Sequence, residues 1–452
     1  MASSKAKVWA MWIAMTIFAA TYLGYAMAGK HQALYLPGAT TDGHYQIELK
    51  CEQCHGGGFE GGAALQKACV RCHGDELAAV EDSHPRKKFT DPRNAERVSK
   101  LDATLCVTCH SEHRPRHTRA MGVTLADDFC VFCHADIEED RKSHKDFGFE
   151  GCAAAGCHNF HDNEALYEDF LVKHGGDPDL LESPRVPARD FGEFNRRVHP
   201  DQAIPLLAAA SDAPSSAAER KIVDDWAKSA HADGGINCSG CHSKTETDRT
   251  WVGKPGLDVC ARCHEAEQTG FRAGKHGMRL AAELEPMSPV LARLPMKADV
   301  KDQPMGCETC HGGHRYDTAR AAVDACLGCH DDDHSREYKK SPHFELPAEA
   351  AVTCATCHLP RLAHKQDGER RVLVQHNQNF NLRPNEKMIR TVCMNCHGLR
   401  FAIDALADPA LIANNFRGKP SKHVGSIDMA IARELSGEKD KDRKERRNEE
   451  GS

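Results

Sequence analysis

Cysteine and histidine recur in this 452-residue chain at one fixed spacing. In ten segments of the form C-x-x-C-H, two thiols stand three positions apart and a histidine follows directly. Thiols at this spacing can form thioether bonds to one porphyrin, and the adjacent imidazole then reaches its iron. The ten segments are Cys51/Cys54/His55, Cys69/Cys72/His73, Cys106/Cys109/His110, Cys130/Cys133/His134, Cys238/Cys241/His242, Cys260/Cys263/His264, Cys307/Cys310/His311, Cys326/Cys329/His330, Cys354/Cys357/His358 and Cys393/Cys396/His397.

An eleventh segment, GCAAAGCHNFH at 151–161, has a longer interval. Cys152 and Cys157 are the two cysteines left over from 22, and His158 follows them. Two extra residues only lengthen the loop between the thiols, so we interpret the segment as a working variant. Zinc is the alternative, because these spacings are also zinc half-sites. Zinc does not need the trailing histidine, which all eleven segments have. The sequence therefore predicts eleven covalently attached haems c.

The remaining histidines decide what the irons can do. An iron with two histidine ligands is saturated and can only pass electrons, whereas an open distal side can bind a substrate. Repeated placement or a short tether to a motif marks a distal candidate; any other histidine is expected to be a surface or hydrogen-bonding residue. The candidates are His44, His84, His113, His144, His161, His231, His276, His314, His334, His343 and His376.

The sites are arranged as two similar runs of five, followed by one more site. A histidine lies seven residues before each run, and the third site of each run carries a second histidine three residues after the first. These histidines are His44 and His231, and His113 and His314. The pattern predicts two pentahaem halves plus an eleventh haem. Shared ligand demands without duplication would leave a similar pattern.

Composition predicts a fold that depends on its cofactors. Only 6% of residues are aromatic and the mean hydropathy is −0.57, so porphyrins must supply much of the buried apolar surface. We expect a mainly α, haem-packed multihaem cytochrome with long loops and little or no β-sheet. The expected parts are 1–28, a signal or transmembrane anchor; 29–165, an N-terminal pentahaem domain; 166–225, a proline-rich linker with little fixed structure; 226–425, a C-terminal hexahaem domain; and 426–452, a short helix and charged tail.

The N-terminus has the pattern of an export signal. Lys5 and Lys7 precede an uncharged stretch, residues 8–28, which as a helix would reach about 31 Å and could span a bilayer. The sequence AMA at 26–28 resembles a cleavage site, but tryptophans and tyrosines near the two ends favour an uncleaved anchor. Either fate places the haem-bearing part on the periplasmic side of a bacterial inner membrane.

Residues 259–416 resemble the C-terminal part of the hydroxylamine oxidoreductase and octahaem reductase superfamily. The similar stretches are VCARCHEAEQTGFRAGKHG, GCETCHGGH, CLGCHDDDHSREYKKSPH, VTCATCHLP and HNQNFNLRP leading to VCMNCHGLRFAIDALAD. The first five sites are similar to small cytochromes with doubled motifs. In the superfamily the catalytic haem precedes the last four, so the resemblance implies that Cys260, Cys263 and His264 hold a candidate open haem.

This chain departs from the superfamily in three respects. It has no tyrosine beyond Tyr338, whereas the oxidoreductase cross-links a later tyrosine to its catalytic porphyrin. The segment after His397 is too short for the trimerising helices, and no lysine replaces a motif histidine. Hydroxylamine oxidation of that type is therefore not expected.

The expected function is electron relay by an undecahaem cytochrome. The predicted partners are a membrane quinol dehydrogenase and periplasmic or outer-membrane cytochromes, with the membrane itself contacted through the N-terminal helix. The alternative is a reductase of a small nitrogen or sulfur compound with the seventh haem as its active site. Nucleic acid is not an expected partner, because no basic stripe with interleaved aromatic residues occurs.

Overall fold

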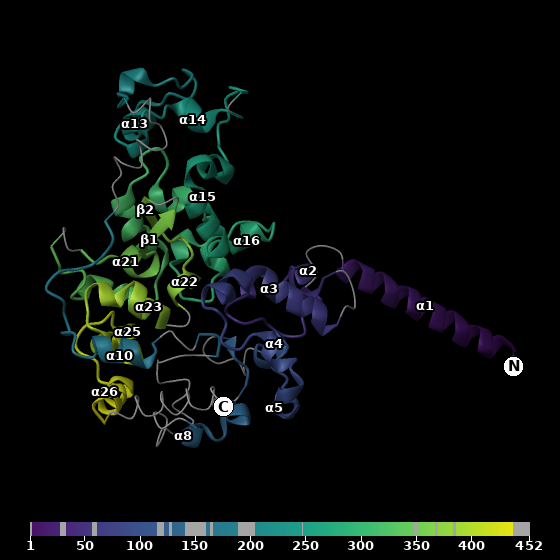
Figure 1. The fold of residues 1–452 in the computed structure, drawn as a ribbon. Coiled ribbons are helices and arrows are strands. Elements are labelled where there is room, and N and C mark those ends of the chain that lie inside the picture. The colour runs from purple at the N-terminus through teal and green to yellow at the C-terminus, as the bar shows by residue number, and fades with distance from the viewer. Residues whose placement is uncertain are drawn as a thin grey trace. The chain divides into compact units, whose positions relative to one another are not determined.

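Short helices joined by loops make up most of the chain in the computed structural model (Figure 1). The structure describes residues 2–27, 33–56, 61–114, 122–125, 129–140, 160–162, 166–188, 204–245, 247–347, 351–366, 369–382 and 386–436. The expectation of a mainly α fold with little β-sheet is confirmed. The chain divides into two compact units, Met1–Ala78 with Arg86–Phe129, and Ala79–Pro85 with Cys130–Ser452.

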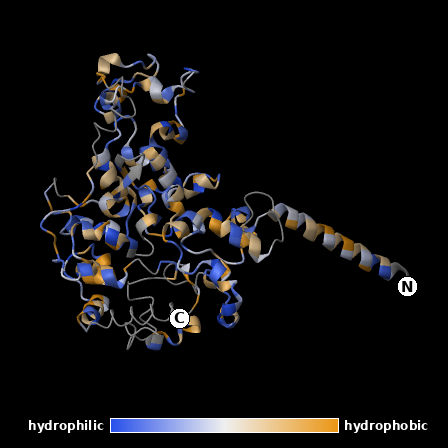
Figure 2. Ribbon diagram, in the orientation of Figure 1, coloured by the Kyte–Doolittle hydropathy of each residue, from blue (hydrophilic) through white to orange (hydrophobic). Residues whose placement is uncertain are grey.

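The N-terminal helix α1 (Ala2–Met27) is long and apolar. Its segment Ser4–Ala26 could cross a membrane by length and composition, a test that a signal sequence also passes. Large apolar side chains along it, among them Trp9, Trp12 and Phe18, are exposed, and Figure 2 shows the apolar residues along the helix. A lipid bilayer would bury these side chains, which are exposed in the structure.

The first unit places its cysteine motifs on helices. In a helix, residues three apart lie on one face, so the two thiols of a C-x-x-C segment point the same way. Among its described residues after α1, the buried side chains are the polar Thr40, Thr41 and Gln46, and no apolar side chain is buried. The elements after α1 are η2 (Tyr45–Ile47), α2 (Cys51–His55), α3 (Gly62–Ala79), α4 (Arg86–Phe89), η3 (Pro92–Asn94), α5 (Ala95–Lys100) and α6 (Cys106–Cys109).

The second unit repeats this construction over a longer stretch. Figure 1 shows α14, α15, α21, α23 and α26 following one another from one end of the unit to the other. The elements are α7 (Val131–His134), α8 (Ile137–Asp140), α10 (Glu168–His174), η7 (Ala208–Ala210), α12 (Arg220–Trp226), α13 (Ala230–Asp233), α14 (Cys238–His242), α15 (Leu257–Ala273), α16 (Met278–Ala281), η8 (Pro289–Leu291), η9 (Ala298–Val300), α17 (Cys307–His311), α18 (Thr318–Ala322), α19 (Asp324–Cys329), α20 (Asp333–Glu337), η10 (Tyr338–Lys340), α21 (Cys354–His358), β1 (Arg361–Gln366), β2 (Glu369–Val374), α22 (Asn379–Leu382), α23 (Glu386–Thr391), η12 (Cys393–Asn395), α24 (Leu399–Leu406), α25 (Pro409–Ala413) and α26 (Ser426–Ser436).

The two strands form one antiparallel hairpin. Arg361 of β1 pairs with Val374 of β2, and the register continues to Gln366 with Glu369. The chain leaves β2 directly into His376, whose Nδ1 lies 2.9 Å from the carbonyl oxygen of Val374. The hairpin therefore presents a distal candidate at its open end.

An apolar core lies where α10, α23, α24 and α26 meet. Its buried members are Leu166, Leu171, Ile389, Leu399, Ala402, Ile403, Ile427 and Ala430. Arg433 of α26 forms an ion pair with Glu168 of α10 at 2.8 Å. We name this group the C-terminal core. Residues 166–225 are predicted from the sequence to form a linker with little fixed structure. They contain α10, η7 and most of α12. Leu171 of α10 and Leu166 just before that helix belong to the C-terminal core.

Candidate haem centres

Nine of the motif histidines each face a second histidine. A metal–imidazole bond of about 2 Å puts an iron about 3 Å from the ring centre, so two imidazoles on opposite sides of one iron have centres about 6 Å apart. The observed separations are His55–His113 6.4 Å, His44–His73 5.9 Å, His84–His134 6.1 Å, His242–His314 6.0 Å, His231–His264 6.1 Å, His276–His330 6.2 Å, His311–His376 6.4 Å, His334–His358 6.0 Å and His343–His397 6.2 Å.

The two runs of sites exchange histidines by the same rule. The first motif histidine of a run faces the extra histidine of the third site, the second faces the histidine that precedes the run, and the fourth faces a histidine soon after the second site. The pairs are His55–His113, His44–His73 and His84–His134 in the first run, and His242–His314, His231–His264 and His276–His330 in the second.

Backbone and ring orientation also match between the runs. His113 and His314 both have left-handed backbone conformations, with φ of 63° and 66°, which point the side chain back toward the first site. Their rings lie within 18° and 3° of the plane of the facing histidine. The His44–His73 and His231–His264 planes instead meet at 65° and 90°. Three features of the geometry therefore repeat, as a duplicated unit would require.

Hydrogen bonds to backbone carbonyls fix the proton position on several of these rings. Nδ1 of His113 lies 2.8 Å from the carbonyl oxygen of Gly38, and Nδ1 of His242 lies 2.7 Å from that of Val252. Nδ1 of His397 lies 2.8 Å from the carbonyl oxygen of Asp179. Similar bonds join His334 to Ile412 at 2.6 Å, and His84 to Phe160. Because a carbonyl oxygen only accepts, Nδ1 must donate, so Nε2 carries the lone pair that could bind a metal. At His334 the amide nitrogen of Asn415 lies 3.3 Å from Nε2.

The second site has carboxylates on both of its imidazoles. Glu112 Oε1 lies 2.6 Å from Nδ1 of His44, and Glu76 Oε2 lies 3.3 Å from Nδ1 of His73. Burial raises the pKa of Glu112, but hydrogen bonds from His44 and from the amide and hydroxyl of Thr41 outweigh it and lower the pKa to about 2. Glu112 is therefore ionised at neutral pH.

The seventh site lacks this distal partner. Nδ1 of His231 is buried and has no hydrogen-bond partner in the part of the chain that the structure describes. Desolvation, with smaller contributions from His264 and His311, lowers the pKa of His231 to about 4. The ring is therefore neutral, which is the form that binds a metal. Its edge rests against Tyr316, with ring centres 4.7 Å apart.

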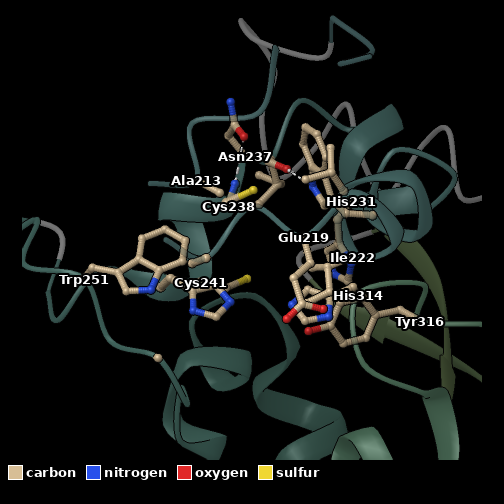
Figure 3. A pocket seen from close by; sticks show the side chains of 16 residues that line it. Ala213, Glu219, Ile222, His231, Asn237, Cys238, Cys241, Trp251, His314 and Tyr316 are labelled. Atoms are coloured by element: carbon tan, nitrogen blue, oxygen red, sulfur yellow. Dashed lines mark hydrogen bonds between the residues drawn. The ribbon is translucent and has the colours of Figure 1, made fainter. Parts of the chain in front are cut away.

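A cavity of about 240 Å³ opens at the sixth site (Figure 3). The thiols of Cys238 and Cys241 and the imidazoles of His242 and His314 line it, together with apolar Trp226, Ile222 and Ile236. Trp251 stacks on His242, with ring centres 4.5 Å apart. Two thiols, two imidazoles and an apolar wall are the donor set that haem c needs, so the residues fit the group.

Neighbouring motifs lie against one another. Arg71 of the second site donates to the carbonyl of Gln53 in the first at 2.6 Å, and Arg262 of the seventh donates to Gly240 of the sixth at 3.5 Å. A hydrogen bond with Cys106 raises the pKa of Cys69. The second and third attachment points are therefore adjacent.

The same contact recurs between later motifs. Hydrogen bonds raise the pKa of Cys307, next to Cys260, and of Cys326, next to Cys354. Burial, and then the proximity of the ninth-site cysteines, raises the pKa of Cys310 to about 11. From the sixth site to the tenth, each attachment point thus touches or approaches the next one in chain order.

Two predicted attachment cysteines, Cys72 and Cys133, differ from these thiols. Cys72 is exposed on α3 and Cys133 is half-buried on α7, and the structure does not bring either thiol into a hydrogen bond with another described residue. The Cys133 amide donates to the carbonyl of Cys130 at 3.1 Å within the same motif. Cys72 contributes, after burial and Glu112, to the raised pKa of Cys54. Haem attachment at Cys72 and Cys133, as at the other motif cysteines, is a prediction from the motif.

Some predicted residues fall elsewhere. Cys152, Cys157, His158 and His144 lie outside the described residues. Nδ1 of His110 lies 3.2 Å from the carbonyl oxygen of Gly122, and Nδ1 of His161 lies 3.1 Å from Asp82. Sequence reasoning missed Glu112; its only signal was a carboxylate directly before the extra histidine of the third site.

Part of the chain is similar to a known family. The cytochrome c3 family model matches residues 43–135, the stretch that holds the first four motifs. The match supports a multihaem cytochrome with covalently bound c-type haem and a role in electron transfer. No curated protein and no solved structure is significantly similar to the chain. The family match does not include residues 259–416, so their resemblance to the octahaem reductases remains a prediction.

Proposed function

We propose that the chain is an undecahaem c-type cytochrome that relays electrons on the periplasmic side of the inner membrane. Its donor would be a quinol-oxidising membrane partner, and its acceptor a periplasmic or outer-membrane protein. One observation carries this proposal: at nine of the motif histidines a second imidazole stands at the distance expected across one iron.

Two imidazoles per iron favour electron transfer over substrate chemistry. Bound haem supplies a reversible one-electron change at the iron. The protein's part is to fill both axial positions, to orient each ring through Nδ1 and to keep attachment points close to one another. This includes His231 opposite His264, at the site that the superfamily resemblance would make catalytic.

The contacts between motifs support a continuous path. Because the attachment points from the sixth site onward approach one another in chain order, we infer that these residues would hold consecutive haems next to one another, and bound haem would supply electron transfer between neighbours. The anchor predicted at α1 would hold the first sites near the membrane, where a quinol-oxidising partner delivers electrons.

Haem stoichiometry and spin state test the proposal together. We expect the mass of the mature holoprotein to exceed that of its polypeptide by eleven haems. The electron paramagnetic resonance (EPR) spectrum of the oxidised protein should contain only low-spin ferric haem. A high-spin signal near one haem equivalent, converted by nitrite or hydroxylamine, would instead support the reductase alternative at Cys260, Cys263 and His264.

A further inference from the structure

The second and seventh sites occupy equivalent places in the two runs but differ beside one ligand. We infer that Glu112, acting through His44, holds the second haem at a lower reduction potential than the seventh, so that electrons settle preferentially in the second run. This inference rests on the proposed electron relay. It makes Glu112 a positioning residue that sets the direction of transfer.

Glu112 is fixed tightly on the distal ring of the second site. Its Oε1 lies 2.6 Å from Nδ1 of His44 and accepts a hydrogen bond of 2.8 Å from the Thr41 hydroxyl, while its Oε2 accepts one of 2.7 Å from the Thr41 amide. Its side chain is 26% exposed. Glu112 directly precedes His113. Two neighbouring residues therefore serve two sites: His113 faces the first motif histidine, and Glu112 contacts the distal histidine of the second site.

Gly313 stands at the equivalent place in the second run. It directly precedes His314, just as Glu112 precedes His113, and it has no side chain to reach His231. This explains why the buried Nδ1 of His231 has no hydrogen-bond partner among the described residues. One substitution between the runs thus accounts for the difference between the two distal rings.

The proximal rings serve as an internal comparison. Each has a glutamate three residues after the motif histidine: Glu76 lies 3.3 Å from His73, and Glu267 lies 4.0 Å from His264. The same residue type occupies the same position in both runs. The main chemical difference between the two sites is therefore on the distal side.

A carboxylate bonded to Nδ1–H changes the ligand. It draws the proton toward itself and raises the electron density on the ring, which stabilises ferric over ferrous iron. Its negative charge, half-buried and close to the iron position, acts in the same direction. The ring of His231 has neither effect. The second haem should consequently be harder to reduce than the seventh.

The test uses full-length holoprotein and reciprocal substitutions. Glu112→Gln should raise the midpoint potential of one low-potential haem, and Glu112→Asp should largely restore it. Gly313→Glu should lower the midpoint of one haem in the second run. A side chain fits there, because a Cβ at Gly313 would meet no atom within 4 Å. Glu96→Gln is the control: Glu96 is exposed on α5, outside the attachment motifs, so its substitution should shift midpoints much less.

Spectroelectrochemical titration supplies the midpoints, and the near-infrared charge-transfer band of ferric haem reports imidazolate character. Loss of one high-energy component in Glu112→Gln, and its gain in Gly313→Glu, would support the inference. Unchanged midpoints and bands in both variants, with full haem content, would overturn it. If Glu112→Gln loses haem, Gly313→Glu alone decides. High-spin haem in the wild type would instead count against the relay and leave this comparison of potentials intact.

Discussion

The two compact units share the pairing of histidines but differ in their packing. In the first unit, no apolar side chain among the described residues after α1 is buried. The second unit ends in the C-terminal core, where eight buried apolar residues from α10, α23, α24 and α26 and their neighbouring loops pack together. The His55–His113 and His44–His73 pairs of the first unit thus form where no apolar side chain is buried among the described residues after α1, whereas the second unit also contains an apolar core.

Each iron would then act as a cross-link. His113 joins the third site to the first, and His44 joins the segment before the run to the second. A cross-link lowers the entropy of the unfolded chain and stabilises the fold by an amount that grows with the logarithm of the length of the loop that it closes. The first unit should rely on these links far more than the C-terminal core does.

Loss of haem should have the largest effect and should separate the two regions. In polypeptide made without haem attachment, we expect the first unit to be digested at once by protease, while α23, α24 and α26 persist longest because their leucines and isoleucines still pack. Limited proteolysis with mass spectrometry of the fragments provides the measurement. Equal digestion rates for both regions would break the comparison.

Removal of one distal histidine should have the same result in either run. His113→Ala and His314→Ala should each convert about one haem to the high-spin state, because each imidazole faces one motif histidine across the expected iron position. EPR of the oxidised protein measures this. His423→Ala is the control, since its two ring nitrogens contact Asp404 and Asp428. An unchanged spectrum in either distal variant would contradict the shared rule.

Truncation in the C-terminal core should destabilise that region alone. Ile403 is 3% exposed, and Ile403→Ala should cost about 2–5 kcal/mol from lost burial and cavity formation. Hydrogen exchange should show faster opening of α24 and α26 and no change in α2 or α3. Leu435→Ala, on the exposed side of α26, should have little effect. A uniform loss of protection across both units would show that they do not unfold separately.

The arginine contacts between motifs should give the smallest effect. Arg71 approaches its carbonyl partner to 2.6 Å and Arg262 to 3.5 Å. Arg71→Ala should therefore cost about 1 kcal/mol of stability and Arg262→Ala less, because both side chains are exposed. Chemical denaturation followed by Soret absorbance can compare them. A larger loss of stability for Arg262→Ala than for Arg71→Ala would contradict this ranking by contact distance.

The sequence predicted distal histidine candidates, but it did not predict which motif histidine each candidate faces. The spacing of His44 and His231 before their runs marked them as candidates, yet each faces the second motif histidine of its run and not the nearer first one. Such crossing depends on how loops return in three dimensions, which spacing along the chain does not encode. Glu112 escaped notice for the same reason, because its contact with His44 spans 68 residues.

The two histidines of the eighth site lie far apart along the chain, so we expect this site to be completed in two stages. His311 faces His376, which follows the β1–β2 hairpin. A chain that leaves the membrane N-terminus first would expose the eighth attachment site well before its axial partner. During export, the residues that would hold the eighth haem would be complete only once the hairpin has emerged, so the second imidazole of this site would be supplied late.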